Sequence, residues 1–228
     1  MGFLIRIPKQ YVENLEQIKY IFEIAVDYII SGRLLAFPTD SVYGIGGDPL
    51  SLEVVEKLFT IKYRDQNKGF LLLVSDFEEA SKIAEFNNVS KLLAEKYWPG
   101  QLTLILKKKA QNIIPPEVTA NQDTIGLRVP DNKIVLEILK MLKLKGKFGG
   151  IIGTSANYSG EEPSVSGAEV AKAFLGTIDL IIDSGKSKSK MPTTIVDCTQ
   201  DKIKFLRIGV IDETSINEFL NSKGYERF

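Results

Sequence analysis

A cationic cluster at residues 62–68 is one place in this sequence where side chains could do chemistry together. Lys62 and Arg64 lie two residues apart at the end of a helical pattern, and Lys68 follows them. Arginine holds a phosphate as a planar fork and lysine holds it as a point charge, so the cluster could bind a triphosphate. Cations at the C-terminal end of a helix also complement the helix dipole, and this structural alternative stays open.

Two more polar groups lie within or directly after apolar strand patterns. Arg128 lies near the end of the apolar segment 125–129, which Thr124 precedes. A buried arginine needs an anionic partner, which could be a ligand or a protein carboxylate. Ser155 and Asn157 directly follow another apolar segment, where their short side chains can donate and accept hydrogen bonds.

The glycine-rich segment 37–48 is the part of the chain around which the other motifs are expected to gather. It lies between a strand pattern and a helical pattern, the usual place of a site in α/β proteins. Ser41 supplies a hydroxyl group there, and the glycines permit positive φ or a close backbone approach. An ordinary glycine-rich turn remains the alternative, because the segment matches neither the dinucleotide fingerprint nor a P-loop. Thr193 and Arg207 adjoin strand patterns near the C-terminus, and each alone is more often structural.

The composition excludes several classes of chemistry. The chain has no histidine and a single cysteine, Cys198, so a Ser-His-Asp triad, a Cys-His pair, a HExxH zinc site and a disulfide framework are ruled out. Lysine plus arginine and aspartate plus glutamate number 29 each, so bulk charge favours neither nucleic acid nor a membrane surface. With 44% hydrophobic residues, the chain can bury a substantial core.

Alternating helical and strand patterns predict one α/β domain over residues 1–228, with helices flanking a twisted mixed sheet. After a short first strand, the predicted helices span 11–31, 52–62, 76–86, 90–97, 133–142, 167–175 and 215–222. The predicted strands span 34–37, 70–74, 102–106, 125–129, 150–153, 178–183, 194–198 and 203–208. Ser166 and Glu169 form a predicted capping box.

The N-terminal residues lack the pattern of a secretory signal, and no apolar stretch reaches transmembrane length. We therefore expect a cytoplasmic protein without membrane contact. The polar segment 184–192 carries lysines and precedes Thr193, and we expect it to be a lid over the site.

Taken in order, the motifs resemble the YrdC-like family of threonylcarbamoyl-AMP synthases in its short form. The resemblance is strongest over residues 30–210. It rests on Phe-Pro-Thr-Asp-Ser-Val-Tyr-Gly-Ile-Gly at 37–46, Lys-x-Arg at 62–64, Trp-Pro-Gly-Gln-Leu-Thr-Leu-Ile-Leu at 98–106, Thr-Ile-Gly-Leu-Arg-Val-Pro at 124–130, Thr-Ser-Ala-Asn-Tyr-Ser-Gly at 154–160 and Thr-Ile-Val-Asp at 194–197.

The resemblance implies a deep concave site that takes ATP, L-threonine and bicarbonate. It implies that the product, threonylcarbamoyl-AMP, passes to downstream transferase proteins that modify tRNA adenosine. The family's nucleotide-binding positions fall on Lys62, Arg64, Lys68, Thr124, Ser155, Asn157 and Arg207, with Lys62 and Arg64 also expected to be catalytic. The positions that hold the amino acid fall on Ser41, Arg128 and Thr193.

The sequence departs from the family's usual residues at several positions. Ser41 stands where threonine is usual, Gln101 where proline is common, and Leu73 where some members have histidine. Asp131-Asn132 replaces a small residue followed by histidine. These differences concern the threonine pocket more than the nucleotide site.

Without histidine, the expected catalysis rests on positioning and charge neutralisation. A magnesium ion on the ATP phosphates is expected, although no carboxylate cluster in the sequence requires it and no protein metal ligands are predicted. The alternative function is an RNA-binding protein that uses the same basic concavity, including Lys107–Lys109, without catalysis. A sensor of amino acids or nucleotides on this fold is a third possibility.

Overall fold

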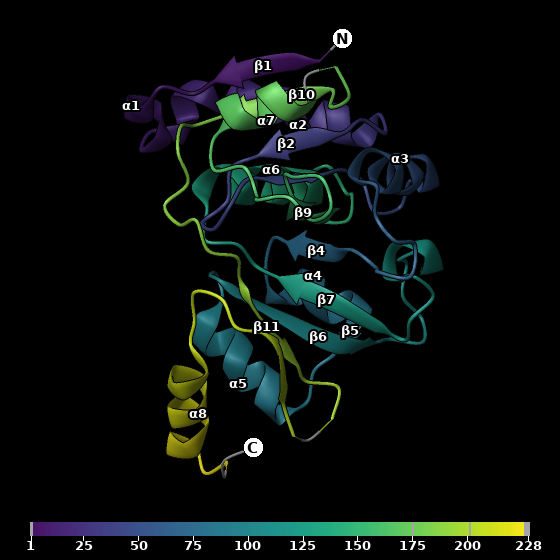
Figure 1. The fold of residues 1–228 in the computed structure, drawn as a ribbon, viewed down its shortest axis with the longest axis vertical. Coiled ribbons are helices and arrows are strands. Elements are labelled where there is room, and N and C mark those ends of the chain that lie inside the picture. The colour runs from purple at the N-terminus through teal and green to yellow at the C-terminus, as the bar shows by residue number, and fades with distance from the viewer. Residues whose placement is uncertain (1, 175, 201, 226–228) are drawn as a thin grey trace.

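The strands lie in two mixed sheets with helices packed around them, as the computed structural model shows for residues 2–174, 176–200 and 202–225 (Figure 1). The predicted α/β class is confirmed, and the strands divide between two sheets where the sequence pattern suggested one. No helix in these ranges is both long enough and apolar enough to cross a membrane.

The first sheet contains the N-terminal strand and has the order β1-β10-β2-β3-β9. The strands are β1 (Phe3–Arg6), β10 (Leu180–Asp183), β2 (Leu35–Phe37), β3 (Gly44–Gly46) and β9 (Thr154–Ser155). The first three are parallel, whereas β3 runs antiparallel to both neighbours. The glycine-rich segment therefore contributes a strand, β3, which the sequence pattern did not predict.

The second sheet has the order β12-β11-β6-β7-β4-β8, and β5 pairs with β6 beside this path. Its strands are β12 (Lys204–Arg207), β11 (Thr194–Asp197), β6 (Leu102–Lys108), β7 (Thr124–Arg128), β4 (Leu71–Val74), β8 (Gly150–Ile152) and β5 (Ala84–Glu85). Parallel pairing joins β11 to β6 and β4 to β7, and the remaining pairs are antiparallel.

Two predicted helices are shorter or more broken than their apolar patterns suggested. The segment 11–31 divides into the end of α1 (Lys9–Val12), the 3-10 turn η1 (Leu15–Ile18) and α2 (Lys19–Ile30). The segment 76–86 divides into α4 (Phe77–Ile83) and strand β5, because pairing with β6 replaces the last helical turn.

The remaining helices match their predicted segments within a few residues. They are α3 (Leu52–Lys62), α5 (Asn88–Tyr97), α6 (Lys133–Leu144), α7 (Gly167–Phe174) and α8 (Glu213–Ser222). The 3-10 turn η2 (Pro116–Thr119) was not predicted. Residue 175, the predicted end of α7, lies outside the described residues. The Ser166 hydroxyl accepts the Glu169 N–H at 3.2 Å, while the Glu169 carboxylate accepts the N–H of Val165 at 2.7 Å.

Two apolar cores support the two sheets. In one, Val26 of α2 and Leu139 of α6 join buried residues of the first sheet, including Phe37 and Ile182. The larger core includes residues of both sheets and lies against α3, α5 and α8, with fully buried side chains such as Leu58, Leu93, Leu104, Leu127 and Leu220. Burial of apolar area supplies the main stabilisation of both.

The two sheets meet where β3 passes β8 and the chain continues from β8 through Gly153 into β9. The Ile152 N–H donates to the carbonyl of Gly47 at 3.0 Å. A Cβ added at Gly46 would lie 1.6 Å from the carbonyl oxygen of Ile152, so a side chain cannot fit there. Glycine at position 46 is therefore required by close backbone approach.

We expect Gly46→Ala to lower the free energy of unfolding by about 3 kcal/mol or more, because the sheets must separate locally to admit the methyl group. Urea unfolding followed by circular dichroism measures the change. Gly146→Ala is the matched control, since an added Cβ there meets nothing within 4 Å and the cost, about 1 kcal/mol, comes only from its φ of 70°. Equal losses in the two variants would contradict this account of the junction.

Candidate functional site

A pocket of about 510 Å³ lies against one face of the second sheet. Side chains alternate between the faces of a strand, so residues two apart point to the same side. Each main strand contributes such residues to the lining: Leu71 and Leu73 from β4, Thr103 and Ile105 from β6, Thr124, Gly126 and Arg128 from β7, and Ile195 from β11. The pocket floor is therefore apolar at its centre and polar towards the strand ends.

Gly126 keeps the centre of this floor open. It pairs with Ile105 of β6 on one side and with Leu71 of β4 on the other. A Cβ at position 126 would lie 3.1 Å from the Ile105 side chain and 3.2 Å from Leu71 Cβ. The absence of a side chain leaves a flat apolar surface on which a planar or aliphatic group can pack.

The segment 39–44 forms one wall of the pocket. Thr39 holds its turn, because the Thr39 hydroxyl donates to the Val42 carbonyl at 2.6 Å and accepts the Ser41 N–H at 3.0 Å. Hydrogen bonds between side chain and backbone stabilise a turn in which the backbone has no strand partner. The Ser41 side chain is consequently fixed at the wall, where it lines the pocket.

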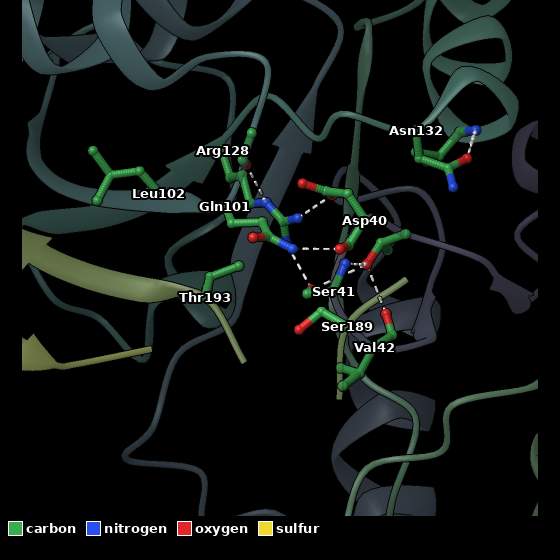
Figure 2. Close-up of polar contacts among 12 residues, drawn as sticks. Asp40, Ser41, Val42, Gln101, Leu102, Arg128, Asn132, Ser189 and Thr193 are labelled. Atoms are coloured by element: carbon green, nitrogen blue, oxygen red, sulfur yellow. Dashed lines mark hydrogen bonds and ion pairs between the residues drawn. The ribbon is translucent and has the colours of Figure 1, made fainter. Parts of the chain in front are cut away.

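Arg128 joins this wall to the floor through a buried ion pair with Asp40 (Figure 2). The exposed fractions of the two residues are 4% and 7%. The Arg128 Nε group donates to the Gly100 carbonyl at 2.8 Å, and Nη1 donates to the Ser41 hydroxyl at 3.3 Å. Burial lowers the pKa of Arg128, and the Asp40 carboxylate opposes that shift. A protein carboxylate thus satisfies Arg128, which also lines the pocket.

Lys62 and Arg64 point in different directions because Tyr63 between them adopts a left-handed conformation, with φ of 49°, at the end of α3. The Lys62 ammonium donates to the carbonyls of Ser155 and Asn157 at 2.5 and 2.7 Å. Lys62 is 2% exposed and does not line the pocket, so it supports the 155–157 wall from behind.

Burial without a carboxylate partner lowers the pKa of Lys62 from its ordinary value of 10.5 to about 8, and the charge of Arg64 adds to the shift. A neutral amine keeps two N–H groups, which can still serve both carbonyls. Lys62 can therefore hold the wall in either protonation state.

Arg64 lines the pocket, with its guanidinium 5.0 Å from the centre of the Phe70 ring. Its Nε and Nη2 groups donate to the carbonyls of Lys68 and Gly69, both at 2.8 Å. These contacts position the cation at the edge of the pocket. Lys68 itself is exposed and does not line the pocket.

Asn157 has an unused acceptor in the pocket wall. Its Nδ2 group donates to the carbonyls of Tyr158 and Glu161, each at 2.8 Å, which fixes the orientation of the amide. The Oδ1 atom is buried and has no hydrogen-bond partner. A buried acceptor without a donor costs free energy, and because this oxygen has almost no accessible surface, a ligand could donate to it only after the 155–157 wall moved.

Thr193 and Arg207 lie together at another part of the lining. Arg207 donates to the Thr193 carbonyl at 2.9 Å and to its hydroxyl at 3.0 Å. The Thr193 hydroxyl also lies 3.0 Å from the hydroxyl of Thr103 in β6. The two residues therefore act as one unit that is anchored to the floor.

The first half of the segment 184–192 is held by hydrogen bonds to other parts of the chain. The Tyr43 hydroxyl donates to the Gly185 carbonyl at 2.7 Å and accepts the Ser184 N–H at 3.1 Å. The Ser187 N–H donates to the Val165 carbonyl at 2.8 Å. A lid over the site stays a prediction, and the movement is now expected of residues 188–191 alone.

Most of the predicted site residues meet in this one pocket although they come from distant parts of the sequence. Lys62 and Lys68 lie outside its lining. Those that line it are Ser41, Arg64, Thr124, Arg128, Ser155, Asn157, Thr193 and Arg207. The sequence reasoning left the partner of Arg128 open and did not predict its pairing with Asp40, because the two residues are 88 positions apart and no local signal links them.

The charge of the lining favours an anion. Its charged side chains are Arg64, Arg128 and Arg207, and none of the described lining residues is aspartate or glutamate. Asp40 offsets only Arg128. The pocket therefore combines an apolar floor with cationic edges, a set that suits a phosphorylated ligand with an apolar or planar part.

Sequence comparison finds close relatives of this chain. A Methanocaldococcus jannaschii protein named as a candidate threonylcarbamoyl-AMP synthase is 36% identical over 211 residues, which cover 92% of this chain and 96% of that protein. The threonylcarbamoyl-AMP synthase of Pyrococcus abyssi is 33% identical over 198 residues, which cover 86% of this chain and 56% of that protein.

Structural comparison agrees with the sequence comparison. The crystal structure of Pyrococcus abyssi Sua5 complexed with L-threonine matches with a TM-score of 0.84 and 29% identity, covering 96% of this chain and 61% of that one. This chain thus spans about three fifths of the Pyrococcus protein. The family model Sua5_yciO_yrdC, described as "Telomere recombination", matches residues 27–209. The chain therefore belongs to the Sua5/YciO/YrdC family.

Proposed function

We propose that this protein is a threonylcarbamoyl-AMP synthase, which makes threonylcarbamoyl-AMP and pyrophosphate from ATP, L-threonine and bicarbonate. The observation that carries the proposal is that predicted nucleotide-binding residues and predicted amino-acid-binding residues line the same cationic pocket. The name of the Pyrococcus relative and the threonine bound in its structure support this function over RNA binding. Transfer of the product towards tRNA by a downstream protein is part of the same proposal.

The amino acid is proposed to bind at the wall formed by Ser41, Arg128 and Thr193. Arg128 already donates through Nε and Nη2 to protein oxygens, whereas its Nη1 contact with Ser41 is long, at 3.3 Å. Nη1 is therefore the nitrogen of Arg128 that can most readily donate a hydrogen bond to a substrate carboxylate. The two hydroxyl groups provide polar partners for the rest of the amino acid.

The nucleotide is proposed to bind along Arg64, Thr124, Ser155, Asn157 and Arg207. The hydroxyl groups of Thr124 and Ser155 suit N–H and O–H groups of adenosine. Arg207 contacts Thr193, so it connects the proposed amino-acid and nucleotide regions. A cation at that point can neutralise charge on the reacting phosphate.

The reaction requires the two substrates to meet in the correct orientation. The amine of threonine and bicarbonate form a carbamate with loss of water, and a carbamate oxygen then attacks the α-phosphorus of ATP, so that pyrophosphate leaves. The protein has no histidine to serve as general base. Its contribution is therefore positioning by the pocket walls and stabilisation of phosphate charge by arginine.

Lys62 is proposed to act through the wall that it supports. Its contacts fix the carbonyls of Ser155 and Asn157, and thereby the side chains that face the nucleotide. Replacement of Lys62 should consequently affect both activity and stability. Lys62 is not an exposed charge at the end of α3, because the residue is 2% exposed.

Magnesium is proposed to enter on the phosphates of ATP. In the described part of the chain, no group of three or more histidine, cysteine, aspartate or glutamate residues is placed to hold a metal ion. The pocket lining offers hydroxyls and arginines, which suit the phosphates and not the ion. When bound, magnesium would supply further neutralisation of phosphate charge.

The purified protein is expected to release pyrophosphate only when ATP, threonine and bicarbonate are all present with magnesium. A coupled pyrophosphate assay, with each substrate omitted in turn, measures this, and mass spectrometry identifies the adenylate. An RNA-binding protein would show salt-sensitive RNA affinity and no turnover. Absence of product with the complete mixture would reject the synthase function.

Arg64→Ala is expected to lower kcat/KM by about a hundredfold, because one charge-stabilising donor is lost from the pocket edge. Arg33→Ala is the matched control, since Arg33 also lies over an aromatic ring, Tyr28, at 4.8 Å and is exposed outside the pocket. Steady-state kinetics and thermal unfolding should be measured for both. Similar kinetics in the two variants would show that Arg64 has no role in the reaction.

Lys62→Met is expected to change the pH dependence of stability. Between pH 8 and 10.5 the unfolded chain keeps the Lys62 proton and the folded protein releases it, so wild-type stability rises with pH relative to the variant, by at most about 3 kcal/mol. Below pH 8 the difference between the two proteins should stay constant. Urea unfolding across pH 7 to 10.5 measures this, and a difference that does not change above pH 8 would contradict the lowered pKa.

A further inference from the structure

Gln101 connects two walls of the pocket without lining it. It lies in the turn before β6, and its side-chain Nε2 donates to the backbone carbonyl of Asp40, as Figure 2 shows. Its own carbonyl accepts the N–H of Thr194 at 3.1 Å. One residue therefore contacts the neighbours of both Ser41 and Thr193, which are the two hydroxyl residues proposed to hold the amino acid.

The orientation of the Gln101 amide follows from its partner. A backbone carbonyl only accepts hydrogen bonds, so the amide nitrogen must face Asp40. The side-chain donor of Gln101 is therefore the group on which this contact depends.

The Arg128 ion pair also holds the Asp40–Ser41 segment, through a different kind of contact. Arg128 forms an ion pair with the carboxylate of Asp40 and donates to the Ser41 hydroxyl, whereas Gln101 donates to the backbone carbonyl of Asp40. A substrate carboxylate at Nη1 replaces the Ser41 contact and shares the charge of Arg128 with Asp40. The neutral Gln101 contact does not depend on that charge, so it can keep the segment in place while the charge of Arg128 is shared.

We propose that Gln101 is a positioning residue for the amino-acid substrate, which fixes the Asp40–Ser41 segment against the start of β11 when Arg128 engages the substrate. This inference rests on the proposed function, because threonine is the substrate named there. It concerns the affinity for the amino acid and not the nucleotide, since both contacts of Gln101 lead to the residues of the amino-acid wall.

The test is Gln101→Met, which keeps the length of the side chain and removes the donor. We expect KM for threonine to rise by about tenfold, with kcat and KM for ATP changed by less than about twofold, because a buried carbonyl loses its donor only at the amino-acid wall. Hydrogen exchange of a peptide covering residues 38–43 should become faster in the free variant. Gln111→Met, at an exposed glutamine outside the pocket, is the control for both measurements.

Three results would overturn the proposal: an unchanged KM for threonine, equal changes in KM for threonine and ATP, or unchanged hydrogen exchange at residues 38–43. Faster exchange with normal threonine kinetics would show a structural contact only, and thus also rejects it. If the variant unfolds, Gln101→Asn, which keeps the neutral amide but withdraws the donor from the Asp40 carbonyl by one methylene, carries the same measurements. If the wild-type protein is inactive, the synthase function itself is rejected. If the wild-type protein is active and the variant has normal kinetics, only the role of Gln101 is rejected.

Discussion

The close backbone contact between β3 and β8 is the constraint on which the pocket depends. Gly46 leaves no room for a side chain against Ile152, and the Ile152 N–H is bound to Gly47. This contact fixes the two sheets relative to each other. Because the 39–44 wall belongs to the first sheet and the floor to the second, the pocket exists only where this junction holds them together.

Each wall of the pocket is held by a polar contact that crosses a long stretch of sequence. Arg128 and Gln101 hold the turn at Asp40, Lys62 holds the segment at Ser155 and Asn157, and Arg207 is joined to Thr193. Buried charges are costly unless they are paired or hydrogen-bonded, and here protein oxygens satisfy them. Pre-arranged walls of this kind reduce the reorganisation that accompanies binding.

The patterns of the sequence predicted most of the helices and strands, and most of the predicted site residues line the pocket. The local signals were strong for α3, α6 and most of the strands, because apolar periodicity acts within a few residues. They failed where a distant strand competed with local preference. Strand pairing with β6 replaced the last turn of the predicted 76–86 helix, and pairing with β2 made a strand of the glycine-rich segment.

The sequence by itself determined the α/β class, the absence of histidine chemistry and the motifs that identify the family. Only the tertiary structure decided which cations face the pocket. Lys62 and Arg64 are near neighbours in sequence, yet the left-handed Tyr63 sends one behind the wall and the other to its edge. Likewise, the partner of Arg128 is Asp40, 88 residues away. Such choices depend on long-range packing, which local spacing does not encode.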